Sequence, residues 1–190
     1  MNEPGLTLAL GGGAAKGLAH IGVLKGVEED GIEVTAIAGS SMGSIIGALA
    51  AQGLSAREME ALVVSIDWVR LGRIMVTSVS GRAFQDMLRE TFGGGLIEEL
   101  PTRFAAVCCD LDTGEMVVLD SGDLAEAVCA SSAIPGILPS MRIGDRRLVD
   151  GAVVEPVPLT AAEAMASGAV LAVSVVRPSD GREERGTIMT

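Results

Sequence analysis

Aromatic residues are scarce in this chain of 190 residues, which has no tyrosine, one tryptophan and three phenylalanines. Hydrophobic residues nevertheless make up 48% of it. The core must therefore be built mainly from Ala, Val, Ile, Leu and Met, and we expect helices and strands that pack closely together. The length favours a single domain, because a typical domain has about 150 residues.

Basic residues are also in short supply. The chain has 14 Lys and Arg against 25 Asp and Glu, which gives a formal net charge of -11. A nucleic-acid-binding protein needs clustered basic residues, so we expect no nucleic-acid partner. The charge also disfavours electrostatic attraction to anionic lipids, so any contact with a membrane surface should be transient and apolar. No apolar run approaches the roughly 18 residues that indicate a membrane-spanning helix.

Residues that bind metals or form disulfides are few. His20 is the sole histidine, and the cysteines are Cys108, Cys109 and Cys129. Because there is no C-x-x-C pair, we expect neither a zinc site of the usual kind nor another metal or cofactor. An odd number of cysteines, two of them adjacent, favours a reduced, cytoplasmic protein. We interpret the three cysteines as core residues rather than as a redox site.

Short apolar runs alternate with segments of helical periodicity, which is typical of parallel strands joined by crossover helices. Ser55 and Glu58 fit an S-x-x-E capping box and predict a helix start. Two prolines keep 131–140 irregular. Strands are predicted at 6–10, 32–38, 103–109, 115–119 and 169–176, and helices at 18–29, 42–52, from 56 onward, 82–92, 124–130 and 159–166.

No repeat or linker divides the chain. We therefore predict one α/β domain over residues 1–176, with three layers in which helices cover a mostly parallel central sheet. The remaining residues, 177–190, are polar and turn apolar at the end. This segment either begins a truncated helix or frays.

Two adjacent serines, Ser40 and Ser41, stand between glycines in the stretch AGSSMGSI. Gly39, Ser41 and Gly43 fit the pattern G-x-S-x-G, in which the serine sits on a strained turn between a strand and a helix with its hydroxyl exposed. The pattern is short and the chain has 25 glycines, so it can occur by chance. Whether Ser41 is a nucleophile therefore has to be judged from the other motifs of the chain.

The glycine-rich segment 11–17 follows the first predicted strand and admits three interpretations. A phosphate-binding P-loop would need Lys and then Ser or Thr after its last glycine, but Leu18 follows here. A dinucleotide-binding loop would need a carboxylate at the end of the second strand, which instead ends in Ala38-Gly39-Ser40. The third interpretation is an oxyanion hole, in which backbone N–H groups at a helix start stabilise a negative oxygen. Consecutive parallel strands would bring this loop and Ser41 to one sheet edge.

A serine nucleophile also needs a base, for which the chain offers two candidates. His20 lies one turn into the helix after the glycine loop. We favour a helix residue with a satisfied hydrogen bond, because hydrolases with G-x-S-x-G place the histidine after the serine. Asp150 follows a predicted strand end and precedes Gly151. Because an ordinary Asp has a pKa of about 3.9, this base would have to be partly desolvated.

Four motifs together resemble the patatin-like phospholipases: GGAAKGLAHIGVL at 12–24, AGSSMGSIIGAL at 38–49, SSAIPGILP at 131–139 and VDGAVVEPVP at 149–158. The resemblance covers about residues 6 to 176. It implies a patatin-like acyl hydrolase domain that cleaves the ester bonds of lipids, with a Ser-Asp dyad and no histidine. The substrate it implies is a lipid or another acyl ester.

The resemblance also assigns roles to residues. Ser41 matches the nucleophile and Asp150, in the D-G-[GA] motif, matches its base. Gly12, Gly13 and Ala14 match the oxyanion loop. The residues that support these groups are Lys16, Gly39, Gly43 and Gly151.

The chain departs from the family in two places. It lacks the further C-terminal helices that members usually carry, and residues 67–81 are shorter than many of their lid segments. One hypothesis for this stretch is an apolar flap over the acyl chain, with ordinary core packing as the alternative; its residues would be Trp68, Leu71, Ile74 and Met75.

Two other classes of function remain open. A non-catalytic lipid-binding or scaffold protein on the same fold would need neither Ser41 nor Asp150, so the intact pair argues against it. A dinucleotide-dependent enzyme would bind its cofactor without acylation of a serine.

Overall fold

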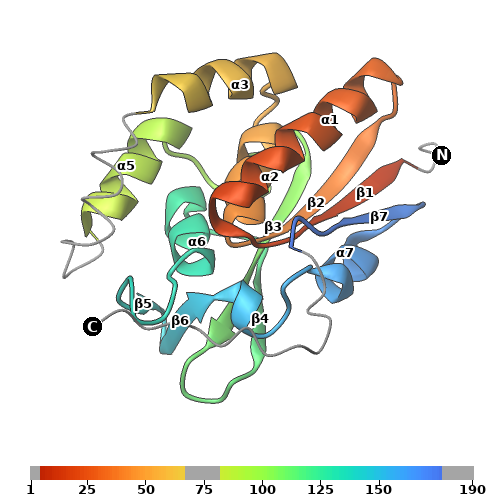
Figure 1. Ribbon diagram of the computed structural model, residues 1–190. Helices are drawn as coiled ribbons and strands as arrows, with labels where there is room; N and C mark the ends of the chain where they lie inside the picture. The colour runs from red at the N-terminus through yellow and green to blue at the C-terminus, as the bar shows by residue number, and fades with distance from the viewer. Residues whose placement is uncertain (1–4, 67–81, 177–190) are drawn as a thin grey trace, which may run out of the picture.

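The computed structural model describes residues 5–66 and 82–176. Within them, one sheet of seven strands has the order β5-β6-β3-β2-β1-β7, with β4 paired to β3 (Figure 1). The strands are β1 (Leu6–Leu10), β2 (Val34–Ser40), β3 (Arg103–Asp110), β4 (Met116–Leu119), β5 (Met141–Ile143), β6 (Arg146–Asp150) and β7 (Val170–Val173). The hypothetical flap at 67–81 and the C-terminal segment at 177–190 lie outside the described residues.

The sheet has a parallel and an antiparallel part. Strands β3, β2, β1 and β7 are parallel to one another, while β4 and β6 run antiparallel to β3, and β5 antiparallel to β6. The predicted pairing of 115–119 with the strand before it is therefore confirmed. The strand predicted to end just before Asp150 is present as β6. It forms a hairpin with β5, which sequence periodicity did not predict, and this hairpin extends the sheet beyond β3.

Helices cover both faces of the sheet. Those of the described residues are α1 (His20–Glu29), α2 (Met42–Ala51), α3 (Ala56–Ser65), α5 (Arg82–Phe92), α6 (Leu124–Ser131) and α7 (Leu159–Met165), with short 3-10 helices η1 (Ala14–Ala19), η2 (Ile97–Glu99) and η3 (Gly151–Val153). Helices α1 and α2 lie on one face and α7 on the other (Figure 1). The predicted three-layer α/β fold with a mostly parallel sheet is confirmed.

The two faces of the sheet carry side chains of different size. Leu8 and Leu10 of β1 point into a large cluster with the helices of the first face. The cluster on the second face is built of smaller residues: Ala9, Ala38, Val107, Ala161 and Ala162. Small side chains let α7 approach the sheet closely, as the shortage of aromatic residues predicted.

Element boundaries differ from the predictions by a few residues. The helix predicted at 18–29 begins as the 3-10 helix η1 and becomes α-helical at His20. Strand β2 spans Val34–Ser40 instead of the predicted 32–38. It pairs with β1 as far as Leu10, which is level with Gly39. The capping box of Ser55 and Glu58 is confirmed, with both reciprocal bonds present. Among the described residues, no helix has the length and apolar character needed to cross a membrane.

Candidate active site

Three chain segments meet at one edge of the sheet. The glycine loop follows β1 and Ser41 follows β2, and these two strands are parallel neighbours. Asp150 ends the antiparallel strand β6 and is level with Cys108 of β3. Because β2 is also a neighbour of β3, residues 109 positions apart in the sequence come together here.

Ser41 occupies a strained turn. Its backbone angles are φ 55° and ψ -125°, a conformation that is uncommon for a residue with a side chain. The flanking glycines make the turn sterically feasible. A Cβ on Gly43 would lie 2.0 Å from the carbonyl oxygen of Leu10, and one on Gly39 would lie 2.4 Å from the Cα of Ser44.

The hydroxyl of Ser41 donates a hydrogen bond of 2.6 Å to Oδ2 of Asp150. Both residues are buried, with exposures of 6% and 3%. The other carboxylate oxygen, Oδ1, accepts a bond of 2.8 Å from the N–H of Ala152. Burial raises the pKa of Asp150 above its ordinary value, and the bonds from Ser41 and Ala152 oppose that rise. A carboxylate with a raised pKa is a stronger base than an exposed one.

The glycine loop lies directly beside Ser41. A Cβ on Gly12 would stand 3.2 Å from the Cβ of Ser41 and 2.9 Å from that of Ala152, so only glycine fits there. The N–H of Gly12 donates to the carbonyl oxygen of Pro156 at 2.8 Å. This differs from the expectation that Gly12 is an oxyanion donor, since its N–H is already bonded.

The next residues of the loop have a different arrangement. Ala14 has φ 47°, and among the described residues it and Ser41 are the two non-glycine residues with a positive φ. Backbone strain of this kind concentrates at functional sites. No bond from the N–H of Gly13 or Ala14 to another described backbone group is seen. Lys16 is exposed on η1.

Of the neighbours of Ser41 and Asp150, Gly151 is needed for close packing, whereas Ser40 makes no hydrogen bond with the carboxylate. A Cβ on Gly151 would meet the carbonyl oxygen of Val107 at 2.0 Å, so Asp150 needs a glycine after it. Ser40 is fully buried, and its hydroxyl has no hydrogen-bond partner within the described structure. Of the two adjacent serines, only Ser41 reaches the carboxylate.

His20 does not join this group. Its Nε2 lies 2.7 Å from the carbonyl oxygen of Gly11, and the ring is fully buried. Burial lowers the pKa of His20, against a smaller opposing effect of the bond to Gly11. The structure agrees with its interpretation as a hydrogen-bonded helix residue.

The cysteines are core residues, as predicted. Cys108, Cys109 and Cys129 are free and buried. Burial, and secondarily the charge of Asp150, raise the pKa of the Cys108 thiol. Within residues 5–66 and 82–176, no three His, Cys, Asp or Glu side chains gather as metal ligands would.

A family model described as patatin-like phospholipase matches residues 8–163. The chain belongs to the patatin-like phospholipase family. An uncharacterized NTE family protein of Mycobacterium bovis is 34% identical over 180 residues, which are 92% of this chain and 50% of that protein. Patatin-like phospholipase domain-containing protein 6 of Mus musculus is 33% identical over 181 residues, 90% of this chain and 13% of that protein. The chain thus spans half or less of these curated relatives.

Two solved structures share the patatin-like fold. VipD from Legionella pneumophila superposes with a TM-score of 0.65 and 15% identity, covering 82% of this chain and 47% of that chain. The type III effector protein ExoU superposes with a TM-score of 0.51 and 20% identity, covering 70% of this chain and 41% of that chain. At these identities the likeness concerns the fold alone.

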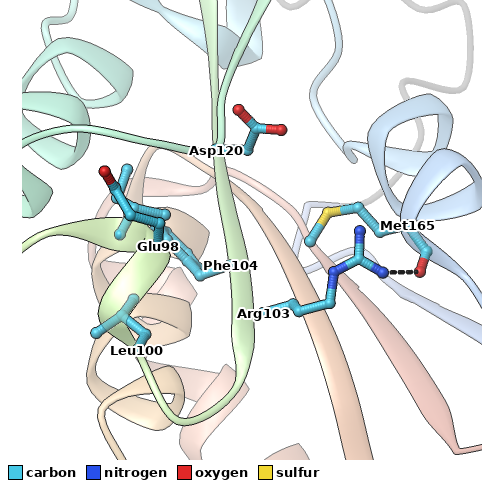
Figure 2. A pocket seen from close by; sticks show the side chains of 7 residues that line it. Glu98, Leu100, Arg103, Phe104, Asp120 and Met165 are labelled. Carbon is cyan, nitrogen blue, oxygen red and sulfur yellow. Dashed lines mark hydrogen bonds between the residues drawn. The ribbon is translucent and has the colours of Figure 1, made fainter.

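A separate cavity of about 260 Å³ lies at the N-terminal end of β3, away from Ser41 (Figure 2). Arg103, at the start of β3, extends beside it and donates a bond of 3.0 Å to the carbonyl oxygen of Met165. Neither Ser41 nor Asp150 lines it; the lining residues are Ile97, Glu98, Leu100, Arg103, Phe104, Asp120 and Met165.

Sequence reasoning missed two hydroxyls around Ser41. Ser44, one turn into α2, donates a bond of 2.7 Å to the carbonyl oxygen of Ser41. Ser131, at the end of α6, contacts the N–H of Ser41. Ser131 belongs to the motif SSAIPGILP, so a signal was present, but nothing in the sequence says which strand ends that motif reaches.

Proposed function

We propose that this chain is a serine acyl hydrolase that cleaves ester bonds of lipids, with Ser41 as nucleophile and Asp150 as its base. The observation that carries the proposal is the buried bond of 2.6 Å between the Ser41 hydroxyl and the Asp150 carboxylate. A nucleophile within hydrogen-bond reach of its base is the arrangement that acyl transfer requires. Membership of the patatin-like phospholipase family supports lipid esters as the substrate class.

In the first half of the reaction, the Ser41 oxygen attacks the ester carbonyl carbon while its proton passes to Asp150. The raised pKa of Asp150 favours this transfer. The carbonyl oxygen becomes negative, and the N–H groups of Gly13 and Ala14 are the donors we assign to it. Gly12 contributes by having no Cβ, since its own N–H is bonded to Pro156.

The intermediate then collapses. The bond from the carbonyl carbon to the alcohol oxygen breaks, and the departing alcohol takes the proton from Asp150. This leaves the acyl group esterified to Ser41. In the second half, Asp150 accepts a proton from water as that water attacks the acyl carbon, and the proton returns to Ser41 as the fatty acid leaves.

The test is covalent labelling with a fluorophosphonate probe, which reacts with activated serines. Wild type should label at one site. Ser41→Ala should not label, and Asp150→Asn should label about 10² to 10⁴ times more slowly because it lacks the base. Hydrolysis of p-nitrophenyl esters and phospholipids of increasing chain length then measures the preferred acyl group.

Ser40→Ala is the matched control. It removes a hydroxyl next to Ser41 that has no partner in the described structure, so labelling should equal wild type. Removing an unsatisfied buried hydroxyl should leave the free energy of unfolding unchanged or slightly raised. If wild type takes no label, or Ser41→Ala labels as fast as wild type, the assignment of the chain as a hydrolase with Ser41 as nucleophile is wrong.

A further inference from the structure

The motif SSAIPGILP has no role in the mechanism above, yet its first residues touch both members of the catalytic pair. We propose that the segment 131–133, at the end of α6, holds Ser41 and Asp150 in the correct position relative to each other, with Ser131 as the positioning residue. This inference rests on the proposed hydrolase function and adds a residue that acts through Ser41 rather than on the substrate.

On the Ser41 side, the segment holds the strained backbone. The N–H of Ser41 donates to the carbonyl oxygen and to the hydroxyl oxygen of Ser131, each at 3.2 Å. Ser132 places its hydroxyl 3.4 Å from the Ser41 carbonyl oxygen, which is long for an O–H···O bond. Because a φ of 55° is unfavourable for serine, it persists only where surrounding contacts fix it.

On the Asp150 side, the segment contacts β3, the strand that pairs with the strand of Asp150. The Ser131 hydroxyl donates a bond of 2.6 Å to the carbonyl oxygen of Val107 in β3. The following residue of β3, Cys108, is level with Asp150 in β6. The segment also contacts Asp150 itself, because the carbonyl oxygen of Ala133 accepts a bond of 3.0 Å from the Asp150 N–H.

One hydroxyl therefore joins the turn that carries Ser41 to the strand that positions Asp150. Ser131 is 0% exposed, so water cannot readily replace its hydroxyl and the residue cannot touch a substrate from solution. Its loss should shift Ser41 relative to Asp150 and Gly13 without changing the surface that binds the acyl chain. A displacement of about 1 Å at a reacting group costs on the order of 10²-fold in rate.

The experiment compares Ser131→Ala, Ser131→Thr and Ser65→Ala in the same chain. Ser131→Ala removes the hydroxyl and keeps the backbone bond to Ser41, whereas Ser131→Thr keeps both. Ser65→Ala removes an exposed hydroxyl that donates to the Leu62 carbonyl oxygen. The measurements are kcat and KM for p-nitrophenyl butyrate, the rate of fluorophosphonate labelling, and the midpoint of thermal unfolding.

Ser131→Ala should lower kcat and the labelling rate about 10- to 100-fold, as expected for misplaced reacting groups, with KM within about twofold of wild type. Ser131→Thr should restore most of kcat, and Ser65→Ala should match wild type. A folded Ser131→Ala with unchanged kcat overturns the positioning role and leaves the hydrolase proposal intact. If Ser131→Ala does not fold, Ser131→Cys, which keeps a weak donor of similar size, is measured by the same criteria. A wild-type chain that neither labels nor hydrolyses overturns both proposals.

Discussion

The two ends of the parallel strands differ in how they use space. At the end that carries Ser41, polar groups are buried and backbone segments touch, so that a single Cβ on Gly43 would collide with the carbonyl oxygen of Leu10. At the other end, a cavity of about 260 Å³ is bordered by the exposed residues Arg103 and Asp120. This cavity is therefore separate from the candidate chemistry, since neither Ser41 nor Asp150 lines it.

The difference shows which observations locate a reactive site. A hollow at a protein surface with exposed charges costs little to maintain, because water solvates those charges. A buried carboxylate beside a strained serine is costly and persists only where the surrounding structure fixes it. The burial of polar groups and the backbone strain therefore carry the functional assignment here.

The largest expected effect is on the crowded end. Gly43→Ala should destabilise the fold by about 3 kcal/mol or more, because its Cβ would lie 2.0 Å from a backbone oxygen that cannot turn aside. The free energy of unfolding in urea measures the loss. The soluble variant, if recovered, should also react more slowly with a fluorophosphonate.

Gly26→Ala is the control for that substitution. Gly26 lies in α1, and outside the backbone of its own helix no described atom stands within 4 Å of the position of its Cβ. Alanine there should stabilise the protein by about 0.5–1 kcal/mol through its helix propensity. Equal effects of the two substitutions would contradict the steric account of the G-x-S-x-G glycines.

A smaller effect is expected from the charge at the crowded end. Because burial raises the pKa of Asp150, the folded protein holds this proton more tightly than the unfolded chain does. The carboxyl group therefore favours folding fully below its unfolded pKa, and that contribution is lost as the pH rises through the folded pKa. Asp150→Asn has no such loss, so its stability relative to wild type should increase from about pH 3 to pH 7.

Urea unfolding of both proteins across this pH range measures the change, and Asp145→Asn, on the exposed turn before β6, controls for the removal of a charge. If the stability of Asp150→Asn relative to wild type instead falls as the pH rises, the hydrogen bonds from Ser41 and Ala152, not burial, dominate the pKa of Asp150.

Much of this crowded end could be predicted from the sequence because its signals are local. The glycine loop and the G-x-S-x-G turn have spacings set by backbone sterics, whereas the D-G motif of Asp150 came from the resemblance to the patatin-like phospholipases. The sequence also favoured Asp150 over His20, and the bond to Ser41 agrees with that choice.

Other features depend on tertiary contacts that no spacing encodes. The bond from Gly12 N–H to Pro156 depends on where the chain passes after η3. The contact of Ser131 with both Ser41 and Val107 depends on how α6 packs against β3. Strand β2 was displaced because its register is fixed by β1, which a search for local apolar runs cannot detect.

The smallest effects are expected at the open end. Arg103→Ala removes an exposed bond to the Met165 carbonyl oxygen and should cost no more than about 1 kcal/mol, while Asp120→Ala should change stability by less than about 0.5 kcal/mol. Neither substitution should alter kcat for p-nitrophenyl butyrate, because the cavity is remote from Ser41. The cavity lies at the N-terminal end of β3. Ser40, which precedes Ser41, is level with Val107 further along β3. A change in kcat with either substitution, at unchanged stability, would mean that the two ends of the sheet are coupled, and the cavity would then have to be included in any account of the reaction.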